Sequence, residues 1–185
     1  MSYKIRVSSR AIIVNEDKIL LNCFGDGLYY NFPGGGIEEN ETAKQAVVRE
    51  VMEEAGLTVD VGELVFSLEY EPKSCNESPA NCRTQADFLH PACPCRGCFG
   101  AHHISFFFRC HLNNDVPPQT PSHTDINPDD PSITSEAKWI PLSDLDKINV
   151  VPRICEPLKN YLETGVFTPS FWAECEHIEN RTWEV

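Results

Sequence analysis

Residues 35–57 read GGIEENETAKQAVVREVMEEAGL, a glycine-led loop that runs into a segment rich in helix-forming residues. Thr42 is suited to cap the first turn of a helix, and Gln45, three residues later, completes a capping box. Gly56 is placed to end the helix, because glycine readily adopts the left-handed conformation of the residue after a C-terminus. The stretch therefore predicts a helix from Thr42 to Ala55 that is entered from a loop.

Glu50, Glu53 and Glu54 stand at i, i+3 and i+4, so helical geometry places them within about 100° of arc on one face. Like charges at this spacing repel by roughly a few tenths of a kcal/mol, and Arg49 is the only cation within a turn of them. Two interpretations stay open on the residues alone: a solvated acidic face, or hard oxygen ligands for Mg²⁺ or Mn²⁺. The preceding glycine loop favours the second, since a loop–helix junction offers backbone groups to ligands.

The full spacing from Gly35 is G-x5-E-x7-R-E-U-x-E-E-x-G-U, where U is a bulky aliphatic residue, and no position departs from it. A chance match in a chain of this size is on the order of one in 10⁷. The pattern is that of the Nudix box, and the chain resembles the Nudix hydrolases over roughly residues 3–163, apart from an insertion at 72–101. The matching residues are Gly35, Glu41, Arg49, Glu50, Val51, Glu53, Glu54, Gly56 and Leu57.

The resemblance implies an α/β fold, a Nudix-type α/β/α sandwich with a mixed β-sheet. Residues 1–165 would form this domain, including the Cys-rich insertion, and residues 166–185 would form a C-terminal tail. Strands are predicted on either side of the box, and Pro33–Gly36 is predicted to be a loop. The expected strands are 3–14, 18–24, 28–32, 57–70, 103–112 and 137–140. Ile154, Leu158, Tyr161 and Leu162 recur at helical spacing, with Gly165 as the stop.

The resemblance also implies roles for single residues. Glu50, Glu53 and Glu54 resemble the metal-binding glutamates of the family, and the carbonyl of Gly34 or Gly35 is expected to add a further ligand. Glu41 and Arg49 resemble the pair that shapes the loop–helix–loop structurally.

The general base is expected to be a box glutamate or an acid from a later loop. Glu53 is the first candidate and Glu136 the second, and Glu50 is also a candidate catalytic residue. Asp125, Asp129 and Asp130 remain open as alternatives.

The implied function is metal-dependent hydrolysis of a pyrophosphate linkage. The substrate would be a nucleoside diphosphate linked to another group, such as a nucleotide sugar or ADP-ribose, or a nucleoside triphosphate. The alternative is a non-catalytic module that senses nucleotides, or a zinc-stabilised module that binds proteins. We expect Mg²⁺ or Mn²⁺ as cofactor and, as in many members of the family, a homodimer.

Charge and hydropathy limit the other partners. A net charge of -13 disfavours long nucleic acid, which binds basic surfaces. No apolar run approaches the roughly 20 residues that span a bilayer, and the first ten residues lack the apolar core of an export signal. A cytoplasmic protein is therefore expected.

Tyr29, Tyr30 and Phe32 precede the glycine loop and allow two interpretations. They are candidates for stacking on a nucleobase, which would make them substrate-binding residues. Alternating packing of a strand into the core explains them as well, and this interpretation is favoured.

The chain has nine cysteines, and five of them fall in the insertion at 72–101. Cys82, Cys93, Cys95 and Cys98 are candidate ligands of a structural Zn²⁺, which would order a segment that has little core of its own. Free or oxidisable thiols and disulfides remain the alternatives, and an intracellular location disfavours disulfides.

Overall fold

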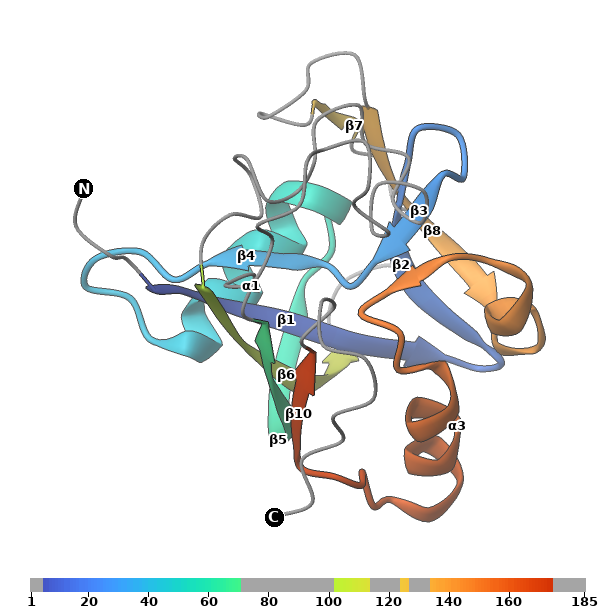
Figure 1. The fold of residues 1–185 in the computed structure, drawn as a ribbon. Helices are drawn as coiled ribbons and strands as arrows, with labels where there is room; N and C mark the ends of the chain where they lie inside the picture. Colours follow the sequence, from blue (N-terminus) through green and yellow to red (C-terminus); the bar gives the residue numbers. More distant parts are fainter. Residues whose placement is uncertain (1–4, 71–101, 114–123, 127–133, 175–185) are drawn as a thin grey trace, which may run out of the picture.

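The computed structural model describes residues 5–70, 102–113, 124–126 and 134–174 (Figure 1). The described strands form one sheet, with a helix on either side. The elements are β1 (Ile5–Asn15), β2 (Lys18–Phe24), β3 (Tyr29–Asn31), β4 (Gly34–Gly36), α1 (Ala43–Ala55), β5 (Val59–Tyr70), β6 (His102–Leu112), β7 (Thr124–Ile126), β8 (Thr134–Pro141), the 3₁₀ helix η3 (Leu142–Lys147), β9 (Val150–Val151), α3 (Cys155–Thr164) and β10 (Phe171–Glu174).

The sheet is mixed and has the order β10-β5-β6-β1-β2-β3-β9, with β8 on β2 and β7 on β8. β1 runs parallel to β6 and antiparallel to β2 and β4. Strands β1 and β2 pair beside their hairpin, at Val14–Ile19 and Asn15–Lys18. Beyond this point β1 continues with β4 and β2 continues with β3 and β8, so the two halves of the sheet separate near the glycine loop.

Two apolar cores hold the layers together, one on each face of the sheet. On one face α1 buries Val47, Val51 and Ala55 against side chains of β1 and β2 such as Ile13 and Leu20. On the other face α3 contributes Leu158 and Tyr161 to a core built on Ile12, Leu21 and the aromatic cluster of Phe32, Phe66 and Phe107. Consecutive apolar residues in β1 face opposite cores, as expected for a strand covered on both sides. The predicted α/β/α sandwich with a mixed sheet is confirmed.

The two predicted helices are confirmed, and so are both ends of the first and the C-terminal end of the second. Thr42 caps α1 and forms the complete capping box with Gln45, while Gly56 follows in the left-handed conformation with φ of 67°. Gly165 ends α3 in the same way, with φ of 74°. In Figure 1, α1 lies behind the central strand β1, whereas α3 lies at the lower right, away from α1.

Two segments differ from the expectations. The predicted loop at Pro33–Gly36 contains a short strand, β4, because Ser8–Arg10 of β1 pair with its three glycines. Glycine is tolerated there since, in the described part of the chain, β4 pairs with β1 alone. The segment after residue 165 also belongs partly to the fold: Phe167 is buried in the α3-side core, and β10 pairs in parallel with β5.

The insertion at 72–101 lies outside the described residues, and with it Cys82, Cys93, Cys95 and Cys98. The zinc site therefore stays a prediction. None of the described helices is long and apolar enough to cross a bilayer.

Candidate active site

Two of the three box glutamates face the glycine strand β4. The carboxylate of Glu50 occupies the space beside the Cα of Gly35: a Cβ built on Gly35 would lie 2.6 Å from Cδ of Glu50. The carboxylate of Glu54 accepts a hydrogen bond from the backbone N–H of Gly34, at 2.7 Å. The helix thus places two acidic groups beside β4, and the absence of a side chain at residue 35 leaves the room for one of them.

Glu53 is the most solvent-accessible of the three. Its side chain is 58% exposed, compared with 15% for Glu50, and its Oε2 accepts from Nη1 of Arg49 at 3.1 Å. A carboxylate in this position reaches solvent while staying next to the two partly buried ones.

Arg49 connects the helix to the preceding loop. Its guanidinium donates to both carboxylate oxygens of Glu41, at 2.9 and 3.0 Å, and to the carbonyl oxygen of Gly36 at 2.9 Å. It also donates to Glu50 at 2.8 Å. The hydrogen bond to Glu41, followed by the contacts with Glu50, raises the pKa of Arg49, and the same bond lowers the pKa of Glu41. A paired, planar guanidinium of this kind fixes the geometry of loop and helix together.

Burial raises the pKa of Glu54 to about 7. The hydrogen bond from the Gly34 N–H, the neighbouring amide of Asn22 and the charge of Arg10 all act in the opposite direction, while Glu50 adds repulsion. Arg10 reaches the loop from β1 and donates to the carbonyl oxygens of Phe32, at 2.8 Å, and Gly34, at 3.3 Å. The glycine loop is therefore held between a cation from the sheet and a carboxylate from the helix.

The raised pKa makes stability depend on pH in the metal-free protein. Between the ordinary pKa of 4.5 and about 7, folded Glu54 keeps a proton that the unfolded chain releases, so the free energy of unfolding falls as pH rises. The shift corresponds to a loss of at most about 3 kcal/mol in the free energy of unfolding. The whole loss applies well above pH 7, and none of it applies below pH 4.5. In a chelating buffer, we expect Glu54→Gln to stabilise the protein at pH 8 and to leave it unchanged at pH 4.

Urea unfolding at the two pH values measures this difference. Glu163→Gln, an exposed substitution on α3, is the control for the loss of one formal charge. The same pH dependence in wild type and Glu54→Gln would contradict the expectation.

The donor set of the helix face suits a hard divalent cation. Among the residues that the structure describes, no three His, Cys, Asp or Glu side chains form a preassembled metal cluster. The carboxylates of Glu50 and Glu54 nevertheless both lie beside β4. Oxygen ligands of this kind are those that Mg²⁺ and Mn²⁺ prefer. Since Arg49 pairs with Glu50 and Glu53, a cation shared by the three carboxylates requires a change in these ion pairs.

Glu136 lies on a different face from the helix carboxylates. Its neighbour Ala137 packs into the α1-side core, so alternation along β8 turns Glu136 away from α1. Its carboxylate pairs with Lys138 at 3.0 Å. The backbone of Asp125 lies in β7, and Asp129 and Asp130 lie outside the described residues.

Packing explains the aromatic residues before the glycine loop. Phe32 is fully buried and meets Phe107 edge-on, so the substrate-stacking alternative does not hold for it in this structure. Tyr29 is 8% exposed and stacks on Phe24, with ring centroids 4.6 Å apart. Tyr30 is partly buried against the α3-side core, and desolvation raises the pKa of its hydroxyl.

Arg10 and Asn22 are neighbours of the carboxylates that the sequence motif did not identify. Arg10 stands at the start of the apolar run of β1, in RAIIV, and Asn22 interrupts that of β2, in ILLNC. This signal is readable in the sequence, because a polar residue in a strand buried on both faces needs a partner.

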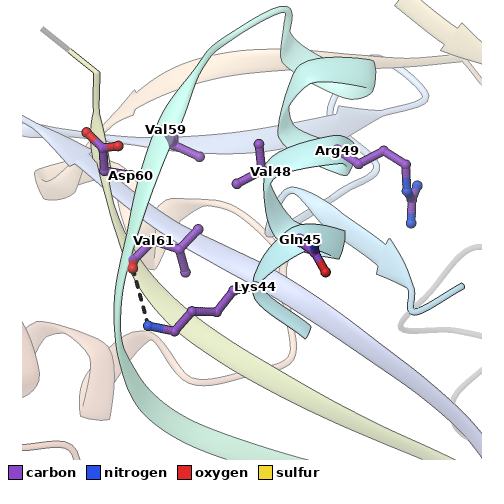
Figure 2. A pocket seen from close by; sticks show the side chains of 7 residues that line it. All are labelled: Lys44, Gln45, Val48, Arg49, Val59, Asp60 and Val61. Carbon is purple, nitrogen blue, oxygen red and sulfur yellow. Dashed lines mark hydrogen bonds between the residues drawn. The ribbon is translucent and has the colours of Figure 1, made fainter. Parts of the chain in front are cut away.

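A shallow hollow lies on the side of α1 that faces β5, with a volume of about 430 Å³ (Figure 2). Val48, Val59 and Val61 line it, and Lys44 bridges it by donating to the carbonyl oxygens of Val61 and Gly62. Figure 2 shows Arg49 extending from α1 away from β5. Arg49 also lines the hollow, whereas Glu50, Glu53 and Glu54 are not among its lining residues.

The model of the NUDIX domain matches residues 4–161 of the chain. This chain belongs to the Nudix family. The match extends the family from the box to most of the described fold, including α1 and most of α3.

Curated Nudix relatives match over short segments. The 8-oxo-dGTP diphosphatase of Escherichia coli K12 is 58% identical over 40 residues, which are 22% of this chain and 31% of that protein. An RNA pyrophosphohydrolase of Histophilus somni strain 2336 is 54% identical over 37 residues, which are 20% of this chain and 19% of that protein. The matches span about a third or less of the length of these relatives.

Solved structures resemble this chain over most of its length. An ADP-ribose pyrophosphatase from Streptococcus suis 89-1591 has a TM-score of 0.54 and 23% identity, with 91% of this chain and 98% of that chain covered. A NUDIX hydrolase from Nitrosomonas europaea has a TM-score of 0.56 and 20% identity, with 94% and 81% covered. At these identities the likeness shows the Nudix fold.

Proposed function

We propose that this Nudix chain hydrolyses a phosphoanhydride bond in a nucleotide-like small molecule, with Mg²⁺ or Mn²⁺ held by Glu50, Glu53 and Glu54. The observation that carries the proposal is the placement of Glu50 and Glu54 against the backbone of β4, at 2.7 Å between Oε2 of Glu54 and the amide of Gly34. A family match over residues 4–161 and a box without a departure support it. On a helix face surrounded only by solvent, the carboxylates would leave room for a side chain at residue 35. Here the carboxylate of Glu50 occupies that space.

A bound divalent cation would neutralise the phosphates, lower the pKa of a water and orient it for attack on phosphorus. The chain's own groups do the rest. Glu50, Glu53 and Glu54 would hold the cation from the helix, and the carbonyl of Gly34 or Gly35 would add a backbone ligand. Glu53, the exposed carboxylate, takes the proton of the attacking water. Arg49 and Glu41 keep the loop and helix in register while charge builds on the phosphoryl oxygens.

Two substrate classes remain. The first is a nucleoside diphosphate linked to another group, such as a nucleotide sugar or ADP-ribose, and the second is a nucleoside triphosphate. An 8-oxo-dGTP diphosphatase carries a name from the second class, and an ADP-ribose pyrophosphatase and a UDP-X diphosphatase carry names from the first, so the names do not decide between the two. The first class would yield a nucleoside monophosphate and a phosphorylated remainder, and the second would yield a monophosphate and pyrophosphate.

A substrate panel with and without metal tests the proposal. Purified protein is incubated with ADP-ribose, nucleotide sugars, ordinary nucleoside triphosphates and an oxidised one, each in Mg²⁺, Mn²⁺ or excess EDTA. We expect turnover of at least one class in either metal, and a fall to background in EDTA that added metal reverses. Chromatography of the nucleotide products identifies the bond that is cleaved.

If protein whose circular dichroism spectrum shows that it is folded turns over no substrate of the panel, the proposed hydrolase activity is contradicted. Nucleotide binding without turnover would then favour a sensing module. One tightly held zinc per chain would favour the zinc-stabilised module that binds proteins. The expected homodimer is checked by the mass of the same preparation in solution.

A further inference from the structure

Asn22 is a fully buried polar residue in the middle of an apolar strand. It lies on β2 between two leucines and Cys23, and it is 1% exposed. Across the neighbouring strands it pairs with Asn31 of β3 and Ala137 of β8. Leu20 and Ala137 both belong to the α1-side core, so alternation along β2 turns the amide of Asn22 to the helix face of the sheet.

Neither Nδ2 nor Oδ1 of Asn22 has a hydrogen-bond partner among the described residues. Buried amides are normally paired, because an unmade hydrogen bond removes a group from water without compensation. An apolar side chain of the same size would satisfy the packing of β2 at lower cost. The amide at this position therefore calls for an explanation beyond the core.

The neighbouring carboxylate is that of Glu54. Asn22 faces the helix that carries Glu54 and is among the groups that lower the pKa of this carboxylate, although neither polar atom of its amide has a hydrogen-bond partner among the described residues. The hydrogen bond of Glu54 recorded within the described residues runs from the amide of Gly34 to Oε2. The unpaired amide of Asn22 thus lies on the same side of the sheet as Glu54, whose carboxylate accepts a hydrogen bond from the backbone of Gly34.

We propose that Asn22 is a positioning residue for Glu54, and that its Nδ2–H donates to this carboxylate when Glu54 binds a divalent cation. The inference rests on the proposed function, since it requires Glu54 to be a metal ligand. Carboxylates that bind metals are held by hydrogen bonds from a second layer of residues, which fix the orientation of the ligand oxygen. The unpaired amide of the metal-free protein is then a donor that finds its partner in the loaded state.

This role predicts two opposite effects of Asn22→Leu. Without metal, the substitution removes two unpaired polar atoms from the core at nearly constant volume, so the melting temperature in EDTA should rise. With metal, Glu54 loses its side-chain donor, so the affinity for Mn²⁺ should fall by about 10- to 100-fold. A residue with a purely structural role would change both quantities in the same direction.

The experiment measures Mn²⁺ binding without substrate, by calorimetry or by the paramagnetic resonance signal of free Mn²⁺, at pH 8. Wild type is compared with Asn22→Leu, Glu54→Gln and Asn31→Leu. The last is the matched control, because it makes the same chemical change on the facing residue of β3, whose Oδ1 is also buried and unpaired within the described chain. We expect Glu54→Gln to lose most of the affinity and Asn31→Leu to stay within about twofold of wild type.

The outcomes separate the two proposals. If wild type binds no Mn²⁺, the metal-dependent function fails and the role of Asn22 fails with it. If wild type binds, Glu54→Gln is weakened and Asn22→Leu binds like wild type, the role of Asn22 alone is overturned. Equal losses in Asn22→Leu and Asn31→Leu would also overturn it, because they would reflect general damage to the β2–β3 pair.

Discussion

Glu53→Gln is expected to lower kcat by about 10²- to 10⁴-fold, the contribution of a general base, on the substrate that the panel identifies. Glutamine keeps the size of the side chain and removes its capacity to take a proton. The fold should survive, because Glu53 is 58% exposed and its loss leaves Arg49 paired with Glu41 and Glu50. An exposed ion pair of this kind contributes less than about 1 kcal/mol. Steady-state rates with saturating metal, together with the melting temperature, separate chemistry from stability.

Two further variants sharpen this result. Glu163→Gln removes an exposed charge from α3 and should leave kcat unchanged. Glu136→Gln tests the second candidate base, which lies on the far face of β8 in an ion pair with Lys138. Wild-type turnover in Glu53→Gln would refute the role of Glu53, and a loss in Glu136→Gln instead would move the base to β8.

Gly34→Ala is expected to destabilise the protein by roughly 3 kcal/mol or more, through backbone strain and overpacking together. Gly34 has a φ of 139°, a conformation that a side chain rarely allows. A Cβ there would lie 2.7 Å from Cα of Arg10 and closer still to the carbonyl oxygen of Ser9. Both are backbone atoms of the central strand β1, which cannot move aside without disturbing its pairing with β6.

Gly35→Ala is the matched control for this prediction, because the atoms that its Cβ meets belong to the flexible side chain of Glu50. The carboxylate can rotate away, so the melting temperature should change little while metal binding and kcat fall. Equal melting temperatures for Gly34→Ala and wild type would show that β1 adjusts, and would contradict the steric account.

The sequence was most informative where local rules act alone. Thr42, Gln45 and Gly56 set the ends of α1 through backbone hydrogen bonds and a left-handed residue, which depend only on near neighbours. The strand at Gly34–Gly36 was missed because it exists through pairing with β1, more than twenty residues earlier in the chain. Glycine has low strand propensity, and pairing with a distant strand overrides it.

The same distinction applies to the site. Spacing alone placed the glutamates on one helix face, and the structure brings Glu50 and Glu54 to the glycine strand. Arg10 and Asn22 influence the pKa of Glu54 from two strands that meet the helix only in the folded chain, so no local pattern predicts this neighbourhood. Burial of Glu54, which raises its pKa to about 7, is equally a property of the assembled layers.

The guanidinium of Arg49 has a consequence for how the helix meets a cation. By donating to Glu41, Glu50 and Glu53 it serves as a built-in counter-ion for the acidic helix. These contacts hold the helix and its loop together through groups that the chain itself supplies. A divalent cation of the kind proposed above would have to compete with this internal cation for Glu50 and Glu53.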